Sequence, residues 1–142
     1  MTESRTLWLI LIVAALVRIA MLVAMPDAFV ADPDGYRGLA ENVLQHEVFG
    51  HGQTPTAYRP PAYPLLLVPC AAAGAGTRFA IGALHVLLGL TTVAITFALA
   101  RRAGMRPVLA ALAAGLVAAD PILLAQSALV MSETLAALLV VL

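Results

Sequence analysis

The longest uncharged run in this chain, from Phe79 to Ala100, constrains its fold more than any other feature. Its 22 residues carry no formal charge and include a single titratable side chain, His85. A helix needs about 20 apolar residues to cross the hydrocarbon core of a bilayer. The run therefore predicts a membrane-spanning helix over 78–100.

The composition of the whole chain agrees with a membrane environment. Of its 142 residues, 62% are hydrophobic and 11% are charged, whereas soluble domains have roughly 45–50% apolar and about 25% charged residues. The eight basic residues are all arginine, and eight acids balance them to a net charge of zero. This balance excludes a disordered tail and a basic protein that binds nucleic acid. The single cysteine, Cys70, excludes a disulfide framework and a cysteine-based zinc site.

Three further apolar segments are predicted spans, at about 6–26, 107–125 and 132–142. The first is also compatible with a signal peptide, whose apolar core has about 7–15 residues. This run is longer and contains Arg18, which favours an uncleaved span. The last segment stops inside a hydrophobic run, so we expect residues 1–142 to be the N-terminal part of one longer membrane domain.

Residues 27–77 form the predicted loop between the first two spans and hold five of the eight acids. Apolar residues recur in this loop with helical spacing, which predicts one amphipathic helix that begins after an N-cap at Asp34 and lies in the membrane interface. These residues are Tyr36, Leu39, Ala40, Val43, Leu44 and Val48. Prolines make the segment 58–64 irregular, and the apolar run 64–73 predicts a short re-entrant or interfacial helix. We therefore expect an all-α, polytopic transmembrane helical bundle with amphipathic juxtamembrane helices in its first loop.

The distribution of arginine predicts how this bundle is oriented. The short segment 101–106 contains three arginines and no acid, and positively charged short loops face the cytoplasm. Counting spans then places the N-terminus on the cytoplasmic side. The first loop, Asp120 and Glu133 are expected on the outer side.

Asp32 and Asp34 stand two residues apart, where the first span leaves the membrane. Such a pair can ligate a divalent cation such as Mg²⁺ or Mn²⁺ through its oxygens, or one member can act as a general base on an acceptor hydroxyl. The simpler interpretation is that Asp34 caps the following helix and Asp32 is a solvated turn residue. The residues themselves leave these alternatives open.

Two arginines and one glutamate are further candidates for the site. Arg18 lies inside the first span, where a charge either faces a cavity or partner or extends to the outer interface. Arg59 is held between Tyr58 and two prolines, which suits phosphate recognition or interfacial anchoring. Glu133 begins the last helix, where the helix dipole favours an acid, or it belongs to the site.

Several short motifs together resemble the N-terminal part of polytopic C-fold glycosyltransferases of family thirty-nine. This family includes the protein O-mannosyltransferases, the lipid A aminoarabinose transferase and their bacterial relatives. The resemblance extends from Arg18 to the end of the chain. It depends on the segments Asp32-Pro33-Asp34-Gly35-Tyr36, Tyr58-Arg59-Pro60-Pro61-Ala62-Tyr63-Pro64, Asp120-Pro121 and Ser132-Glu133.

The resemblance implies an inverting transferase in a bacterial inner membrane, with its site on the outer face. It implies a polyprenyl-phosphate-linked sugar as donor, within the lipid membrane, and an acceptor hydroxyl on a glycan, lipid or protein. Asp32 or Asp34 matches the acidic residue that acts as base on the acceptor, and a divalent metal is used by some relatives. Arg59, with Tyr58, matches a basic position before paired prolines and is the candidate for binding the donor phosphate, together with Arg18 and Glu133. By itself this segment is expected to be inactive.

Two other classes of protein remain as alternatives, a transporter subunit and a membrane scaffold without catalytic activity. A transporter predicts ionisable residues spread through its spans at mid-membrane depth. Here they gather at the outer rim of the predicted bundle, which favours the transferase. No nucleotide-binding loop or hydrolase motif occurs, and His46, His51 and His85 share no metal-ligand spacing.

Overall fold

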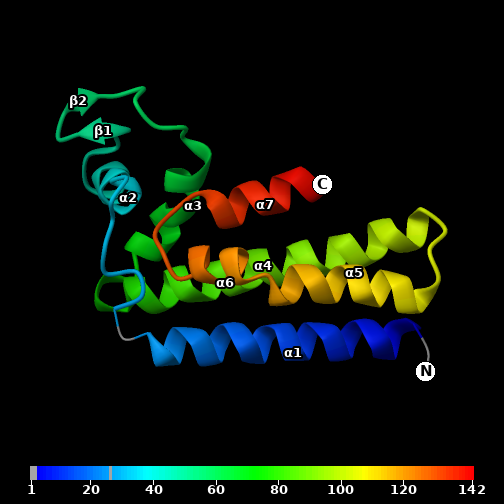
Figure 1. The fold of residues 1–142 in the computed structure, drawn as a ribbon. Helices are drawn as coiled ribbons and strands as arrows, with labels where there is room; N and C mark the ends of the chain where they lie inside the picture. The colour runs from blue at the N-terminus through cyan, green and yellow to red at the C-terminus, as the bar shows by residue number, and fades with distance from the viewer. Residues whose placement is uncertain (1–2, 26) are drawn as a thin grey trace.

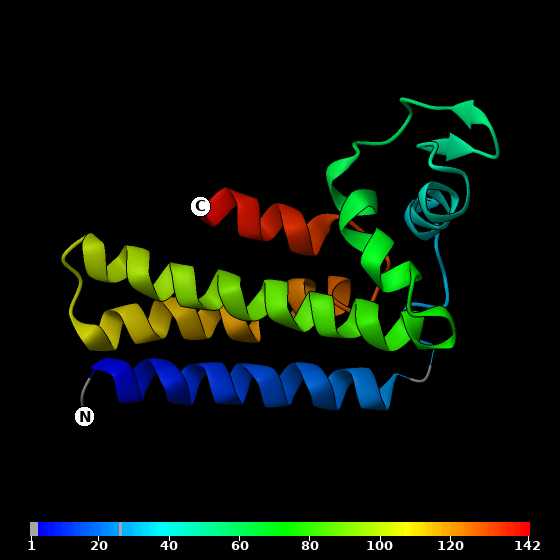
Figure 2. The ribbon, with the colours of Figure 1, turned by 180° about the vertical axis from the view of Figure 1, so that it is seen from behind.

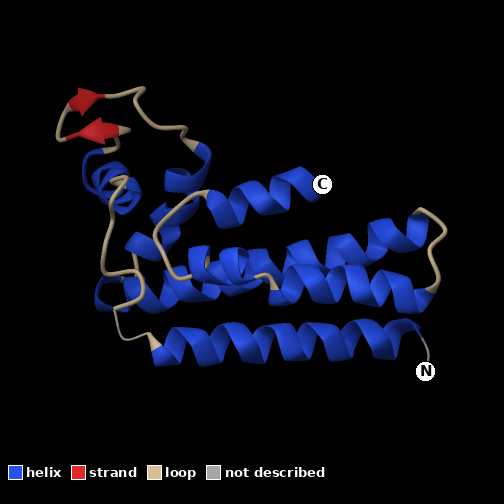
Figure 3. Ribbon diagram, viewed as in Figure 1, coloured by secondary structure: helices blue, strands red, loops and turns tan. Residues whose placement is uncertain are grey.

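The computed structural model describes residues 3–25 and 27–142 and is almost entirely helical, which confirms the predicted all-α fold class (Figures 1 and 3). A single small hairpin is the only sheet in the described residues. In chain order the elements are α1 (Glu3–Ala24), α2 (Tyr36–His46), β1 (Gly50–His51), β2 (Thr54–Pro55), α3 (Ala62–Ala71), the 3₁₀ turn η1 (Gly74–Gly76), α4 (Thr77–Arg102), α5 (Pro107–Ala119), α6 (Pro121–Gln126) and α7 (Glu133–Val141).

Two helices in the described residues are long and apolar enough to cross a membrane. They are α1 with 22 residues and the continuous segment Gly74–Arg102 with 29 residues. At 1.5 Å per residue these correspond to about 33 and about 44 Å, against a hydrocarbon core of about 30 Å. They match the predicted spans 6–26 and 78–100, except that Pro26 lies outside the described residues.

Helices α1, α4 and α5 pack side by side (Figures 1 and 2). The buried face of α5 consists of alanines four residues apart, Ala110, Ala114 and Ala118. They meet Ala14 of α1 and Phe97 of α4 in one cluster. Small residues at this spacing allow helix backbones to approach closely, which is how helices associate in lipid, where apolar burial alone gives no driving force.

The predicted span 107–125 is divided into two helices. α5 ends at Ala119, Asp120 has an extended backbone, and α6 starts at Pro121. Oδ1 of Asp120 accepts hydrogen bonds from the amides of Ile122 and Leu123, at 2.9 and 2.8 Å. Because aspartate is a favoured N-cap and proline a favoured first helical residue, this pair stops one helix and starts the next.

The first loop folds over one end of the bundle, which we call the loop end (Figure 1). Helix α2 packs on α3, and α3 packs on α4. The hairpin is attached to α2 by Asn42, whose side-chain amide donates to the carbonyls of Val48 and Gly52 and accepts from the Gly52 amide. The predicted amphipathic helix is present as α2, with Tyr36, Leu39 and Ala40 buried.

Two local predictions about this loop were wrong. The N-cap of α2 is Gly35, which has a left-handed backbone (φ 72°), so the Asp34 side chain does not cap the helix. Helix α3 begins at Ala62, so Tyr63 and Pro64 are helical although the segment 58–64 was predicted to be irregular. Proline is compatible with the first turn because the amides there have no intrahelical acceptor.

The opposite end of the bundle holds the start of α1 and the α4–α5 connection. Nη2 of Arg101 lies 2.5 Å from Oε1 of Glu3 and joins the end of α4 to the start of α1. This pair confirms that the N-terminal end of α1 and the arginine-rich segment share one side, which we call the arginine end. The first loop lies at the other end (Figure 2).

Candidate functional site

The ion pair between Arg59 and Asp34 is the centre of the candidate site. Nη2 of Arg59 donates to Oδ1 of Asp34 at 2.8 Å, and both side chains are about one quarter exposed (26% and 27%). The guanidinium also lies over the rings of Tyr58 and Tyr36, at 4.8 and 5.6 Å from the ring centres. Stacking and ion pairing hold the planar cation in place while part of it stays accessible.

Asp32 has a different role from Asp34. Its Oδ2 accepts from the amide of Gly38 at 3.0 Å, so it satisfies one of the free amides in the first turn of α2. Its Oδ1 is buried and has no hydrogen-bond partner among the described residues. The interpretation of Asp32 as a solvated turn residue was therefore wrong, and its second oxygen has a lone pair available.

Tyr63 brings the first loop and the start of α7 together. Burial raises the pKa of its hydroxyl well above the usual range, and the nearby carboxylates of Asp32 and Glu133 add to the shift. The Tyr63 hydroxyl therefore remains protonated. Oε2 of Glu133 is buried and, like Oδ1 of Asp32, has no partner among the described residues.

Tyr36 makes a second connection between α2 and α7. Its hydroxyl lies 3.5 Å from Oγ of Ser132, the N-cap residue of α7. Its ring meets Tyr63 edge-on, with centres 5.2 Å apart. Arg59 lies over the Tyr36 ring, and the carboxylates of Asp32 and Glu133 are near Tyr63. The contact between the two tyrosines therefore joins these polar groups in one site at the loop end.

His85 of α4 contacts this site from the interior of the bundle. Its Nδ1 lies 3.0 Å from the carbonyl of Ser127, and its Nε2 lies 2.7 Å from the Tyr63 hydroxyl. A carbonyl only accepts, so Nδ1 carries the proton and Nε2 accepts from Tyr63. His85 is fully buried, with the Phe29 ring edge-on against it. One side chain thus connects α3, α4 and the segment after α6.

Arg18 lies in the interior of the bundle and not with Arg59. It is 3% exposed, and its Nη1 lies 3.4 Å from the carbonyls of Ala14 and Ala118. In a continuous helix the Ile122 amide would bond to the Ala118 carbonyl, but that amide bonds to Asp120. Arg18 therefore supplies a donor at the broken C-terminus of α5, where the helix dipole also favours a cation. This arrangement contradicts extension of Arg18 to the outer interface.

The described residues do not form a donor set for a metal. No group of three or more His, Cys, Asp and Glu residues comes together within residues 3–25 and 27–142. Asp34 is neutralised by Arg59, and Asp32 uses one oxygen on a backbone amide. Asp32 and Asp34 in this arrangement do not by themselves form a complete site for the possible Mg²⁺ or Mn²⁺ ion, and the proposed mechanism uses no metal.

The predicted site residues therefore separate into two groups. Asp32, Asp34, Tyr58, Arg59 and Glu133 lie together at the loop end, whereas Arg18 contacts the α5 break. Sequence reasoning missed Tyr36, Tyr63, His85 and Ser132 as members of the site. His85 had one detectable signal, because it is the only titratable side chain in the apolar run from Phe79 to Ala100.

Comparison with known proteins gives one match. A family model described as dolichyl-phosphate-mannose-protein mannosyltransferase matches residues 69–142, which is about half of the chain and includes α4 to α7. No curated protein matches. No solved structure matches either.

Proposed function

Because the chain belongs to the dolichyl-phosphate-mannose-protein mannosyltransferase family of membrane glycosyltransferases, we propose that its loop-end site transfers a sugar from a polyprenyl-phosphate donor to an acceptor hydroxyl. The observation that carries this proposal is that one site contains both the Arg59 guanidinium, held by Asp34, and two carboxylates with unpartnered oxygens, Asp32 and Glu133. Such a site can bind a phosphate leaving group and accept a proton. A membrane scaffold without catalytic activity needs neither group.

Arg59 binds the donor phosphate in this proposal. Its Nε has no partner among the described residues, and the stacked tyrosines restrict its orientation. A planar guanidinium can bond two phosphate oxygens at once. When the donor binds, phosphate competes with Asp34 for Nη2. Asp34 therefore positions Arg59 before the donor arrives.

Asp32 is the proposed general base. Its Oδ1 is free of hydrogen bonds, and the Gly38 amide holds the other oxygen in place. The acceptor oxygen forms a bond to the anomeric carbon of the sugar, and the bond from that carbon to the phosphate oxygen breaks. The hydroxyl proton passes to Asp32, and the polyprenyl phosphate leaves with its negative charge next to Arg59. Such proton transfer typically contributes about 10²–10⁴-fold to a rate.

Glu133 is proposed to orient the acceptor. Its unpartnered Oε2 lies in the same site as Asp32, and both carboxylates raise the pKa of the Tyr63 hydroxyl. A carboxylate at this position can accept a hydrogen bond from a second hydroxyl of the acceptor. We further propose that the loop end faces the outside of a bacterial inner membrane, since three arginines lie in the short segment at the arginine end.

The test uses the intact protein in membranes supplied with a labelled polyprenyl-phosphate sugar, with mannose as the first sugar tried. We expect Asp32→Asn to lower kcat by about a hundredfold or more with little change in the KM of the donor. Arg59→Lys and Asp34→Asn should chiefly raise the donor KM. Asp27→Asn is the matched control, because Asp27 is an acid of the same loop with an exposed side chain.

Two results would contradict the proposal. If Asp32→Asn and Asp34→Asn both retain wild-type turnover, the acidic-loop mechanism is wrong. If Asp34→Asn abolishes kcat while Asp32→Asn leaves it unchanged, the assignment of the base is wrong.

A further inference from the structure

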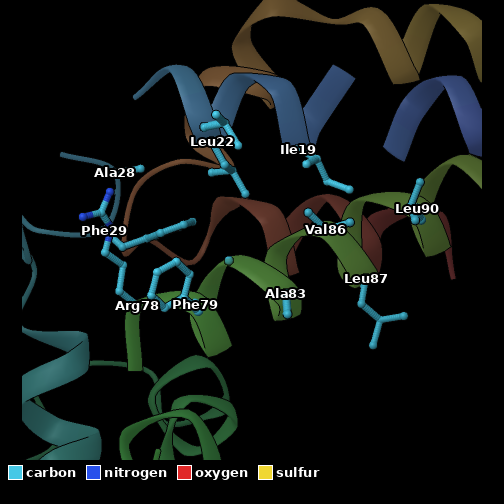
Figure 4. A pocket seen from close by; sticks show the side chains of 12 residues that line it. Ile19, Leu22, Ala28, Phe29, Arg78, Phe79, Ala83, Val86, Leu87 and Leu90 are labelled. Carbon is cyan, nitrogen blue, oxygen red and sulfur yellow. The ribbon is translucent and has the colours of Figure 1, made fainter. Parts of the chain in front are cut away.

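A groove of about 660 Å³ runs along the outside of the bundle between α1 and α4 (Figure 4). Ile19 and Leu22 of α1 form one wall, and Ala83 and Leu87 of α4 form the other. Of the 12 residues that line it, Arg78 is the one with a charge. The groove lies on the surface of two predicted membrane-spanning helices, so in a bilayer it would be filled by hydrocarbon chains.

The length of the groove corresponds to one leaflet of a bilayer. From Arg78 to Leu90 its α4 wall covers 12 residue steps, or about 18 Å at 1.5 Å per residue. Half of a hydrocarbon core is about 15 Å. Arg78 lies at the loop end of this distance, beside Phe29 and Phe79 (Figure 4). A cation thus lies at head-group depth above an apolar channel of leaflet length.

The surroundings of Arg78 favour an anion. It is the second residue of α4, where the positive end of the helix dipole adds to its charge. Its only hydrogen bond among the described residues is a long one, 3.4 Å from Nη2 to the carbonyl of Met25, so most of its five N–H donors are available. Asp27, two residues after Met25, lines a separate hollow with Ala24 and Leu129.

A second groove of the molecule provides a comparison. It lies between α1 and α5, has a volume of about 480 Å³ and is lined by apolar residues such as Val13 and Gly115, without any charge among the described residues. Both grooves suit hydrocarbon chains. A cation at head-group depth distinguishes the α1–α4 groove.

We propose that the α1–α4 groove binds an anionic phospholipid of the membrane, with one acyl chain along α4 and its phosphate at Arg78. This lipid is separate from the sugar donor, whose phosphate is assigned to Arg59. It lies next to the site, because Phe29 contacts both the groove and His85. A bound lipid would therefore stabilise the packing of Phe29 against His85, the residue that accepts the hydrogen bond from Tyr63.

Native mass spectrometry of the detergent-solubilised protein tests this proposal, with phosphatidylglycerol and phosphatidylcholine supplied at equal concentration. We expect the wild type to retain phosphatidylglycerol preferentially, and Arg78→Gln to weaken its retention by about tenfold or more. Ala83→Trp, at an exposed position in the groove, should remove the bound lipid. Arg102→Gln at the arginine end and Gly115→Trp in the second groove are the matched controls and should leave retention unchanged.

The proposal fails if the wild type retains both lipids equally, if Arg102→Gln lowers retention as much as Arg78→Gln, or if added polyprenyl phosphate displaces phosphatidylglycerol. A photoreactive amino acid at position 83 gives an independent measurement. We expect an adduct with the mass of one phospholipid. Crosslinking to a polypeptide segment instead would show that protein covers the groove and would overturn the proposal.

Discussion

The hydroxyl of Tyr63 donates to Nε2 of His85 across 2.7 Å, and this hydrogen bond joins α3 of the first loop to the longest helix of the bundle. Both side chains are fully buried. His85 in turn donates to the carbonyl of Ser127. The position of the first loop on the bundle therefore depends on a buried series of two hydrogen bonds, from Tyr63 to His85 and from His85 to Ser127, in which each acceptor has a donor.

Removing the Tyr63 hydroxyl should destabilise the protein. Tyr63→Phe keeps the ring but leaves Nε2 of His85 buried without a donor, which costs about 1–3 kcal/mol. We expect a lower midpoint of thermal unfolding in detergent. Tyr58→Phe is the control, because Tyr58 is 80% exposed and should show no shift. Equal midpoints for Tyr63→Phe and the wild type would mean that the hydrogen bond does not hold the loop.

A side chain at position 89 should displace Arg18. A Cβ atom on Gly89 would lie 2.5 Å from Nε of Arg18, which is closer than Cβ atoms come to other heavy atoms in proteins. Arg18 is surrounded by packed helices, and the cavity beside it measures about 10 Å³, so the guanidinium has no second position inside the bundle and can only move outward. We expect Gly89→Ala to lower the unfolding midpoint and to expose Arg18 to chemical modification.

Gly115→Ala is the matched control for that substitution. Position 115 is also in a helix, but a Cβ there would meet nothing within 4 Å. Alanine is favoured over glycine in helices by about 1 kcal/mol, so this variant should be as stable as the wild type or more stable. A Gly89→Ala protein as stable as Gly115→Ala would contradict the buried position of Arg18.

The side chain of Asp120 should stabilise the break between α5 and α6. Asp120→Ala removes the acceptor for the amides of Ile122 and Leu123 and should cost about 0.5–2 kcal/mol. Asp120→Asn keeps an oxygen acceptor and should retain most of the stability. Hydrogen exchange of the Ile122 and Leu123 amides measures the effect locally. Unchanged protection in Asp120→Ala would rule out capping by this side chain.

Removal of divalent metal should leave transfer unaffected. Arg59 supplies the positive charge for the leaving phosphate, and Asp34 is occupied by that arginine. We therefore expect equal turnover before and after treatment with EDTA, measured with the labelled donor. Loss of turnover in EDTA, restored by Mg²⁺ or Mn²⁺ and not by Ca²⁺, would show that a metal shares the role given to Arg59.

Hydropathy and local signals were sufficient for the framework of this protein. The uncharged run from Phe79 to Ala100 predicted a long helix, and the period of the apolar residues after Asp34 predicted an amphipathic helix. The arginine-rich segment 101–106 predicted an end of the bundle shared with the N-terminus. The structure confirms each of these three features. The two helices are predictable because each depends on neighbours within a few turns of the chain, where spacing and composition already describe the environment. The shared end follows from the charge of a short loop and from the number of spans before it.

Only the tertiary structure decided which partner each charged group has. Asp34 pairs with Arg59, 25 residues away. Arg18 reaches Ala118, 100 residues away, because Asp120 and Pro121 end α5 at that point. Local sequence placed Asp34 on a helix cap and left Arg18 between two environments. A buried charge takes the partner that packing brings close enough to compensate its desolvation, and that partner is set by how distant helices meet and not by the residues beside it in the chain.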